Sequence, residues 1–221
     1  MNVLFEDRDI IVCQKPGGVL SQADDAGKES MITLLGQHTG TEIFPLHRLD
    51  REVGGVMVYA KTKRAAAALS RDIADHRFEK EYLALVHGSP DAPSGELRDL
   101  LFKDSRQNKS FVVDRPRRGV KEAILTYEQV NTAVIDGEAY TLVRVKLQTG
   151  RTHQIRVQFS SRKMPLGGDK KYGARDAFDT IMLWSYRIGF RHPVSGEPMS
   201  FSLDPDHTMK HYLSVLYKTC V

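Results

Sequence analysis

Hydrophobic and polar positions alternate along much of the chain, as half-buried β-strands require. The opening segment VLFEDRDIIVCQKPGG predicts two short strands around a polar turn, closed by Pro16, Gly17 and Gly18. Asp136 and Gly137 predict a turn between two further strands that are neighbours in a sheet. These two strands are expected over residues 123–130 and 139–150, and the remaining ones over residues 56–61, 79–88 and 182–190.

Helical segments lie between these strands. Helices are predicted over residues 30–39, 63–76 and 207–218. Thr62 is expected to cap the second of them. The segment RTHQIRVQFSS predicts a short helix with Thr152 as its N-cap, which sets His153 and Arg156 one turn apart. The mixed order predicts an α+β fold with a largely antiparallel mixed sheet, flanked by helices and loops, in one domain over residues 1–221.

Composition indicates an ordinary globular protein, with 41% hydrophobic and 27% charged residues in a chain of 221. Apolar runs such as residues 10–13 fall far short of the roughly 20 residues that cross a membrane. The N-terminal segment lacks the apolar stretch of a secretory signal, which predicts a cytoplasmic protein. Cys13 and Cys220 lie at opposite ends of the chain and form no C-x-x-C unit, so we expect neither a disulfide nor a zinc site.

Positive charge is concentrated in one segment. The net charge is +4 and the isoelectric point about 9.0, which alone favours a polyanionic partner only weakly. In KDSRQNKSFVVDRPRRGVK, residues 103–121, seven Lys or Arg residues accompany two Asp residues. Two interpretations stay open: a solvated loop, or a segment that contacts phosphates.

The sequence lacks the motifs of several classes of enzyme. GGDKKYG lacks the spacing and the strand–turn–helix context of a phosphate-binding loop. No H-E-x-x-H or comparable metal-ligand spacing occurs, and G-x-S-x-G is absent. We therefore expect no ATP-driven step, no metal and no nucleophilic serine.

The stretch PLHRLDREVGGVMVYAKT brings a basic and an acidic side chain together beside paired glycines. On an extended backbone, Arg48 and Asp50 point to one side, and His47 and Leu49 point to the other. The pair is either a surface ion pair or a working acid kept in its charged form. Taken alone, such a pair is more often a surface bridge, and a strand tyrosine such as Tyr82 is more often a core aromatic.

Three separated segments carry a further pattern: HRLD at residues 47–50, KEYLALV at residues 80–86 and GRTHQIR at residues 150–156. Together they resemble the RluA family of RNA pseudouridine synthases. Its motifs are H-R-L-D with the catalytic aspartate, K-x-Y-x-A-x-V with an active-site tyrosine, and G-R-T-H-Q-I-R, whose last arginine pairs with the aspartate. The resemblance gives these roles to Asp50, Tyr82 and Arg156. EDRDIIVCQKPGGV, LGGDKKYG and HPVSG are similar to further blocks of the family and occur in the same order.

The family reaction breaks the N1–C1′ bond of a uridine, turns the uracil and rejoins it through C5. Asp50 is implied either to attack C1′ or to remove the C2′ proton, and the sequence leaves both routes open. Arg156 is implied to keep this carboxylate ionised through its planar fork. Tyr82 is implied to stack on the extruded uracil, to accept the C5 proton, or both. Arg48 is expected to enter the space left by the flipped nucleotide, with Ile155 as an apolar wall of the pocket.

His47, Leu49 and Lys15 are also expected at the substrate-binding site, although Lys15 has the alternative of anchoring a turn. The resemblance further implies the pseudouridine synthase catalytic fold with an active-site cleft across the sheet. It implies no cofactor and no metal. Related enzymes often carry an N-terminal S4 RNA-binding domain, but here the predicted opening hairpin begins within five residues of Met1, so we expect none. The expected enzyme is a monomer that acts on ribosomal or transfer RNA.

The chain departs from the family pattern at three positions. Val53 and Gly54 replace a threonine and a serine, so a hydroxyl that could brace the loop after Asp50 is missing. Gln158 stands where the family often has histidine.

Two rival functions belong to other classes. An RNA-binding module without turnover would be expected to lose Asp50 or Arg156, and both are present. A uridine C5 methyltransferase needs a nucleophilic cysteine and a methyl-donor site, and neither Cys13 nor Cys220 lies in a supporting motif.

Overall fold

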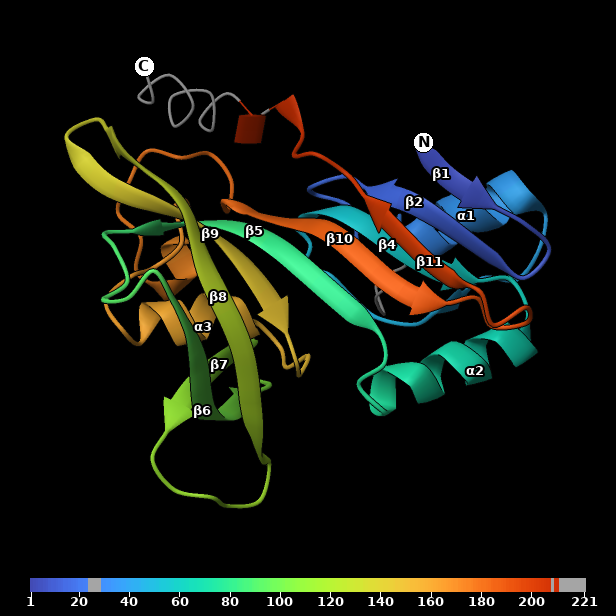
Figure 1. Ribbon diagram of the computed structural model, residues 1–221, viewed down its shortest axis with the longest axis horizontal. Helices are drawn as coiled ribbons and strands as arrows, with labels where there is room; N and C mark the ends of the chain where they lie inside the picture. Colours follow the sequence, from blue (N-terminus) through green and yellow to red (C-terminus); the bar gives the residue numbers. More distant parts are fainter. Residues whose placement is uncertain (24–28, 208, 211–221) are drawn as a thin grey trace. The chain divides into compact units, whose positions relative to one another are not determined.

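A computed structural model describes residues 1–23, 29–207 and 209–210 (Figure 1). The chain divides into two compact units. Of the described residues, the first unit comprises those within 1–80 and 184–206, and the second comprises 81–183, 207, 209 and 210. Each unit is described by itself.

The first unit contains a mixed sheet in which strands follow the order β1-β2-β4-β10. β11 pairs with β10 and β3 with β4. β4 and β10 run parallel, whereas β1–β2, β2–β4, β3–β4 and β10–β11 are antiparallel. The strands are β1 (Val3–Glu6), β2 (Ile10–Lys15), β3 (Phe44–Pro45), β4 (Gly54–Ala60), β10 (Leu183–Arg191) and β11 (Pro198–Ser202).

Two helices complete this unit, α1 (Met31–Thr39) and α2 (Lys63–Ala74). Side chains cap both N-termini: Ser30 accepts a hydrogen bond from the backbone N–H of Thr33, and Thr62 accepts one from that of Ala65. The predicted cap of the second helix is therefore confirmed. α2 packs on the sheet through a core that includes Ile10, Val12, Val56, Val58, Leu69, Phe78, Ile188 and Phe190.

Gly54 and Gly55 allow β10 to approach β4 closely. Trp184 pairs with Gly54 and Ser185 with Gly55 in the parallel register. A Cβ atom on Gly54 would overlap the Trp184 ring, and one on Gly55, whose φ is +128°, would overlap the Ser185 backbone. The paired glycines that follow Asp50 in the sequence are therefore required by strand packing.

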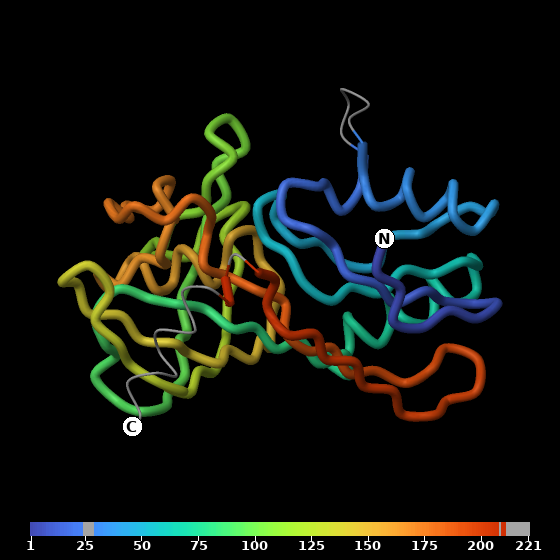
Figure 2. Tube along the Cα trace, turned by 90° about the horizontal axis from the view of Figure 1, so that it is seen from above, coloured from blue at the N-terminus to red at the C-terminus, as the bar shows by residue number. Residues whose placement is uncertain are grey.

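The second unit is built on antiparallel strands in the order β5-β9-β8-β6-β7. They are β5 (Glu79–His87), β6 (Ser94–Asp104), β7 (Lys109–Val113), β8 (Val120–Ile135) and β9 (Glu138–Leu147). The predicted turn joins β8 to β9, with positive φ at both Asp136 and Gly137. A helix, α3 (Gln154–Ser160), and a 3-10 turn, η1 (Lys170–Tyr172), follow. Figure 2 shows the β6–β7 hairpin, in green, projecting from the rest of this unit.

The predicted α+β class is confirmed, and two local predictions are corrected. Thr152 is not the N-cap of α3, because the chain turns into the left-handed region at His153, which is the N-cap residue and makes no side-chain cap. The basic segment is not a simple loop, because residues 109–113 form β7. The terminal helix predicted over residues 207–218 lies largely outside the described residues, and Cys220 lies wholly outside them. No helix in the described part of the chain is long and apolar enough to cross a membrane.

Candidate active site

Asp50 begins a tight turn that leads into β4. The backbone N–H of Val53 donates to the Asp50 carbonyl at 3.1 Å, which closes the turn. Leu49 is buried and Arg48 is exposed, so these neighbours point in opposite directions as their alternation predicted. Asp50 itself is half-buried.

Lys15, at the end of β2, holds this turn by hydrogen bonds to backbone carbonyls. Its side chain is fully buried, and Nζ donates to the carbonyls of Pro16, Arg51 and Val53 at 2.9, 3.0 and 2.7 Å. Burial lowers the pKa of Lys15 to about 8, although the nearby Asp50 and Glu52 carboxylates oppose the shift. An ammonium has three donors, and here backbone oxygens accept all three. This geometry favours the interpretation of Lys15 as an anchor of the turn.

Ser21 holds the chain on the other side of Asp50. Its Oγ accepts from the Leu49 N–H at 3.0 Å and lies 2.9 Å from the Leu49 carbonyl, to which it donates. The Tyr59 hydroxyl donates to the Ser21 carbonyl at 3.1 Å. A hydroxyl from another segment therefore holds the backbone of the residue before Asp50. Sequence reasoning missed Ser21, because no local pattern links it to a loop 28 residues away.

The ring nitrogens of His47 are buried, whereas a side chain that binds a phosphate of RNA must be exposed. Both of its ring nitrogens are buried, and neither has a hydrogen-bond partner among the described residues. Its ring lies 5.5 Å from that of Phe78, centroid to centroid. Burial, together with the nearby Lys80 ammonium, lowers the pKa of His47 to about 3. The imidazole is therefore neutral at physiological pH and offers hydrogen bonds without charge.

Tyr82, Ile155 and Arg156 belong to the second unit. Tyr82 lies in β5 opposite Val145 of β9 and is 5% exposed. Ile155 and Arg156 occupy the first turn of α3, each 4% exposed. Burial of a tyrosine and an arginine to this degree requires specific partners for their polar atoms.

The start of α3 is fixed by the side chain of its first residue. Gln154 Oε1 accepts from the Thr149 hydroxyl at 2.8 Å and from the backbone N–H of Arg151 at 3.0 Å. Later in the helix, Gln158 Nε2 donates to the Leu97 carbonyl and to Asp99. The glutamine in place of the family's histidine thus ties α3 to β6.

Arg156 forms a bidentate ion pair that the sequence did not indicate. Nε donates to Asp169 Oδ2 at 2.7 Å and Nη2 donates to Asp169 Oδ1 at 2.9 Å. The guanidinium carbon also lies 5.1 Å from the centre of the Tyr172 ring. Asp169 and Tyr172 both belong to LGGDKKYG. The sequence showed that this block resembles the family but did not indicate what the block does.

The predicted residues are divided between the two units. Lys15, His47, Leu49 and Asp50 lie in the first unit, and so does Arg48. Tyr82, Ile155 and Arg156 lie in the second. The pairing of Arg156 with Asp50 that the resemblance implies stays a prediction.

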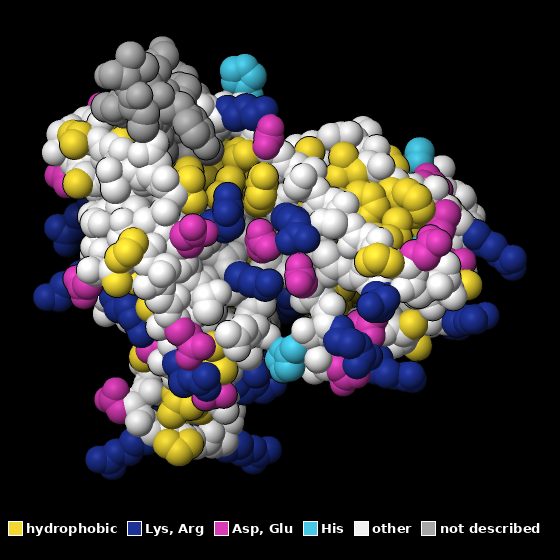
Figure 3. Space-filling view, viewed as in Figure 1, with side chains coloured by type: hydrophobic (Ala, Val, Ile, Leu, Met, Phe, Trp, Pro, Cys, Tyr) yellow, Lys and Arg dark blue, Asp and Glu magenta, His cyan; other side chains and the backbone are white. Residues whose placement is uncertain are grey.

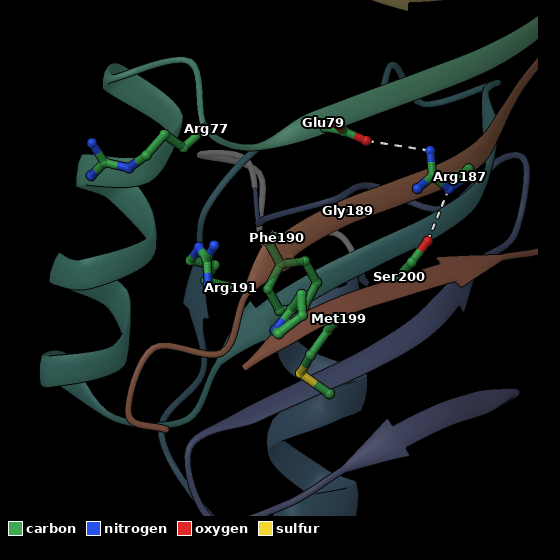
Figure 4. A pocket seen from close by; sticks show the side chains of 9 residues that line it. Arg77, Glu79, Arg187, Gly189, Phe190, Arg191, Met199 and Ser200 are labelled. Carbon is green, nitrogen blue, oxygen red and sulfur yellow. Dashed lines mark hydrogen bonds and ion pairs between the residues drawn. The ribbon is translucent and has the colours of Figure 1, made fainter. Parts of the chain in front are cut away.

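A pocket of about 280 Å³ in the first unit contains none of the predicted site residues (Figure 4). Its lining includes Phe190 and Met199 together with Arg77, Arg187 and Arg191. Arg187 pairs with Glu79, and Arg77 pairs with Asp72 and Asp75 outside the pocket lining. These carboxylates offset the positive charge, so the pocket is not a strongly cationic site. Within the described part of the chain, no group of His, Cys, Asp and Glu residues could hold a metal ion.

A family model described as RNA pseudouridylate synthase matches residues 9–161 of the sequence. This chain belongs to that family. An RNA pseudouridine synthase of Aquifex aeolicus, named as uncharacterized, is 33% identical, over 98% of this chain and 73% of its own length. Ribosomal large subunit pseudouridine synthase C of Buchnera aphidicola is 29% identical, over 97% of this chain and 70% of its own length.

Solved structures show the same fold. Human RNA Pseudouridylate Synthase Domain Containing 4 superposes with a TM-score of 0.80 at 20% sequence identity, covering 98% of this chain and 93% of the human one. The predicted family and fold are therefore confirmed. As a member of the family, this RNA pseudouridine synthase isomerises uridine in RNA to pseudouridine, and RNA is its substrate.

Proposed function

We propose that Asp50 is the essential carboxylate of this pseudouridine synthase. The reaction needs an anionic oxygen beside the ribose, either to attack C1′ or to remove the C2′ proton. The observation that carries the proposal is the support of the Asp50 turn from both sides, by Lys15 and by Ser21. Such support favours a fixed position, which both routes require, because small displacements of a reacting group are costly.

Arg156 is proposed to bind the Asp50 carboxylate and to keep it ionised when RNA closes the site. A guanidinium presents two edges, each with parallel donors. The edge made by Nε and Nη2 binds Asp169, and the edge made by Nη1 and Nη2 suits a second carboxylate. Tyr82 is proposed to stack on the extruded uracil and to accept its C5 proton. Arg48, which is exposed, is proposed to enter the gap left by the flipped nucleotide, and Ile155 to form an apolar wall.

RNA affinity is proposed to come in part from the β6–β7 hairpin and the loop after it. Arg115, Arg117 and Arg118 are exposed, and the Arg117 guanidinium lies 4.7 Å from the Phe102 ring centre. Figure 3 shows Lys and Arg side chains on both sides of this projection. Exposed cations on a projecting hairpin are suited to contact phosphates.

Ribosomal RNA is the proposed target, because two relatives are named as ribosomal large subunit pseudouridine synthases, C of Buchnera aphidicola and D of Zymomonas mobilis. Transfer RNA is the alternative. We further propose that residues 1–221 act as one catalytic domain, as a cytoplasmic monomer that uses no metal and no cofactor.

The deciding experiment uses RNA labelled with tritium at C5 of uridine, because C5 loses its hydrogen when it becomes bonded to the sugar. We expect the wild type to release tritium to water in the presence of a chelator and without a methyl donor. Asp50→Asn should bind RNA and release none, since the amide is neither nucleophilic nor basic. Release by Asp50→Asn within about tenfold of wild type, which is about 1.4 kcal/mol of barrier, would remove Asp50 from the mechanism.

Glu52→Gln is the matched control, because Glu52 is an exposed carboxylate in the same turn. It should release tritium at the wild-type rate. An RNA-binding module would release none in any variant, and a C5 methyltransferase would release it only with its donor. Separate assays on ribosomal and transfer RNA identify the target class.

A further inference from the structure

Asp169 holds the proposed catalytic arginine in a fixed orientation. The side chains of Arg156 and Asp169 are 5% and 0% exposed, so neither charge is compensated by bulk water. Two parallel hydrogen bonds of 2.7 and 2.9 Å join them. Because both donors lie on one edge of a rigid plane, the carboxylate fixes the orientation of that plane and so the direction of its Nη1–Nη2 edge.

The carboxylate and the guanidinium are each held by a further contact. Asp169 Oδ1 accepts from the backbone N–H of Tyr172 at 3.3 Å, as the cap of η1. The Tyr172 ring lies against the guanidinium, and its hydroxyl is anchored in turn. That oxygen accepts from the Ser110 N–H at 2.8 Å and lies 2.9 Å from His153 Nδ1. Arg156 is therefore held directly by Asp169 and Tyr172. Residues of β7 and of the start of α3 hold the Tyr172 hydroxyl in turn.

The charges in this cluster have a mechanistic consequence. The negative charge of Asp169 offsets the positive charge of Arg156 at less than 3 Å. A compensated guanidinium exerts little long-range field and acts mainly through directed hydrogen bonds at short range. Its orientation then matters more than its charge.

We propose that Asp169 is a positioning residue of the pseudouridine synthase reaction: it aims the second edge of the Arg156 guanidinium, with Tyr172 holding the plane. This inference rests on the proposed role of Arg156 toward the reacting carboxylate. It makes a prediction opposite in sign to that of a simple charge effect. If Arg156 acted as a point charge, removal of the Asp169 charge would strengthen its field and would not slow the reaction.

Asp169→Asn tests this prediction. The change keeps the shape of the side chain but turns an amide N–H toward the guanidinium donors, so the bidentate bond is lost. At saturating enzyme, we expect the single-turnover rate of tritium release to fall about 100-fold, because misplacement of a catalytic group by about 1 Å has an effect of that size. RNA affinity should not weaken, since the net charge rises by one. A folded Asp169→Asn enzyme with the wild-type rate would overturn the proposal.

Asp72→Asn is the control. Asp72 lies in α2 of the first unit and accepts from Arg77 Nε and Nη2 at 3.0 and 2.6 Å, a pair that does not involve α3 or η1. The change removes a carboxylate from another arginine pair and should leave the turnover rate unchanged. If Asp72→Asn slows turnover as much as Asp169→Asn does, the effect is a general loss of packing and the inference fails.

A double-mutant cycle with Arg156→Lys separates positioning from other effects. If Asp169 acts through Arg156, then Asp169→Asn should slow Arg156→Lys much less than it slows wild type. Fully additive effects would contradict the proposal. Should Asp169→Asn fail to fold, Asp169→Glu keeps the buried charge and displaces the guanidinium. A wild-type rate in that variant would be equally decisive against positioning.

The same assays tell the two proposals apart. Wild-type turnover in Arg156→Lys and Arg156→Ala would refute the proposed role of Arg156 itself. Slow turnover in these variants, with normal turnover in Asp169→Asn, would refute only the positioning role of Asp169.

Discussion

His47 shows at the scale of a single residue how burial decides what a side chain can do. Both ring nitrogens are removed from water, and the pKa of this histidine falls to about 3, against about 6.5 for a free imidazole. The unfolded chain therefore binds a proton below about pH 6.5 that the folded protein does not bind until about pH 3. The free energy of unfolding decreases as the pH falls through this window, by up to about 1.4 kcal/mol per pH unit from this group.

We expect His47→Phe to flatten that dependence, because the proton taken up on unfolding is lost with the imidazole. Urea unfolding between pH 7 and pH 4.5 measures it. The same substitution at the exposed His207 should leave the slope as in wild type. An equal slope in His47→Phe and wild type would mean that His47 titrates alike in the folded and unfolded chain.

At the scale of elements, the end of β2 and the segment after it hold the turn that carries Asp50. Lys15→Met removes the donor for the carbonyls of Pro16, Arg51 and Val53. Because buried acceptors are left unsatisfied, we expect a loss of about 3 kcal/mol or more in the free energy of unfolding, together with slower tritium release in the protein that remains folded.

Lys61→Met is the comparison for this change. Lys61 Nζ bonds Glu6 and the Asp7 carbonyl, away from the Asp50 turn. It should reduce stability less and leave turnover unchanged. Normal turnover in folded Lys15→Met would show that the turn keeps its geometry without the ammonium.

At the scale of the whole molecule, charge governs how the enzyme meets RNA. Replacement of Arg115, Arg117 and Arg118 by Ala should weaken RNA binding and flatten its salt dependence. Each lost phosphate contact should reduce the slope of log K against log[salt] by roughly 0.7–0.9. Filter binding between low and moderate salt measures the slope.

A second triple variant changes the net charge equally, through the exposed Arg8, Lys63 and Arg64 of the first unit. It should alter the slope less. Equal slopes in both variants would mean that only net charge matters. An unchanged slope in the first would mean that these three arginines are solvated and contact no phosphate.

The sequence by itself determined most of the elements and the family. The β8–β9 hairpin and the capped helix α2 follow from patterns within a few residues, namely strand alternation around Asp136–Gly137 and a cap at Thr62. Asp50, Tyr82 and Arg156 were found through short motifs, and their roles stay predictions. Local propensity predicted Thr152 as the N-cap of α3, but the N-cap residue is His153, whose backbone is left-handed.

The tertiary structure alone decided which groups support these residues. Ser21 reaches Leu49, Lys15 reaches Val53, and Asp169 reaches Arg156 across 28, 38 and 13 residues of chain. Each contact joins a buried polar atom to a partner whose distance in sequence is set by how strands and turns pack. Periodicity in the sequence reports which face of an element is buried. It carries no record of which distant donor or acceptor satisfies a polar group once water is excluded, and that choice is made only when the chain is folded.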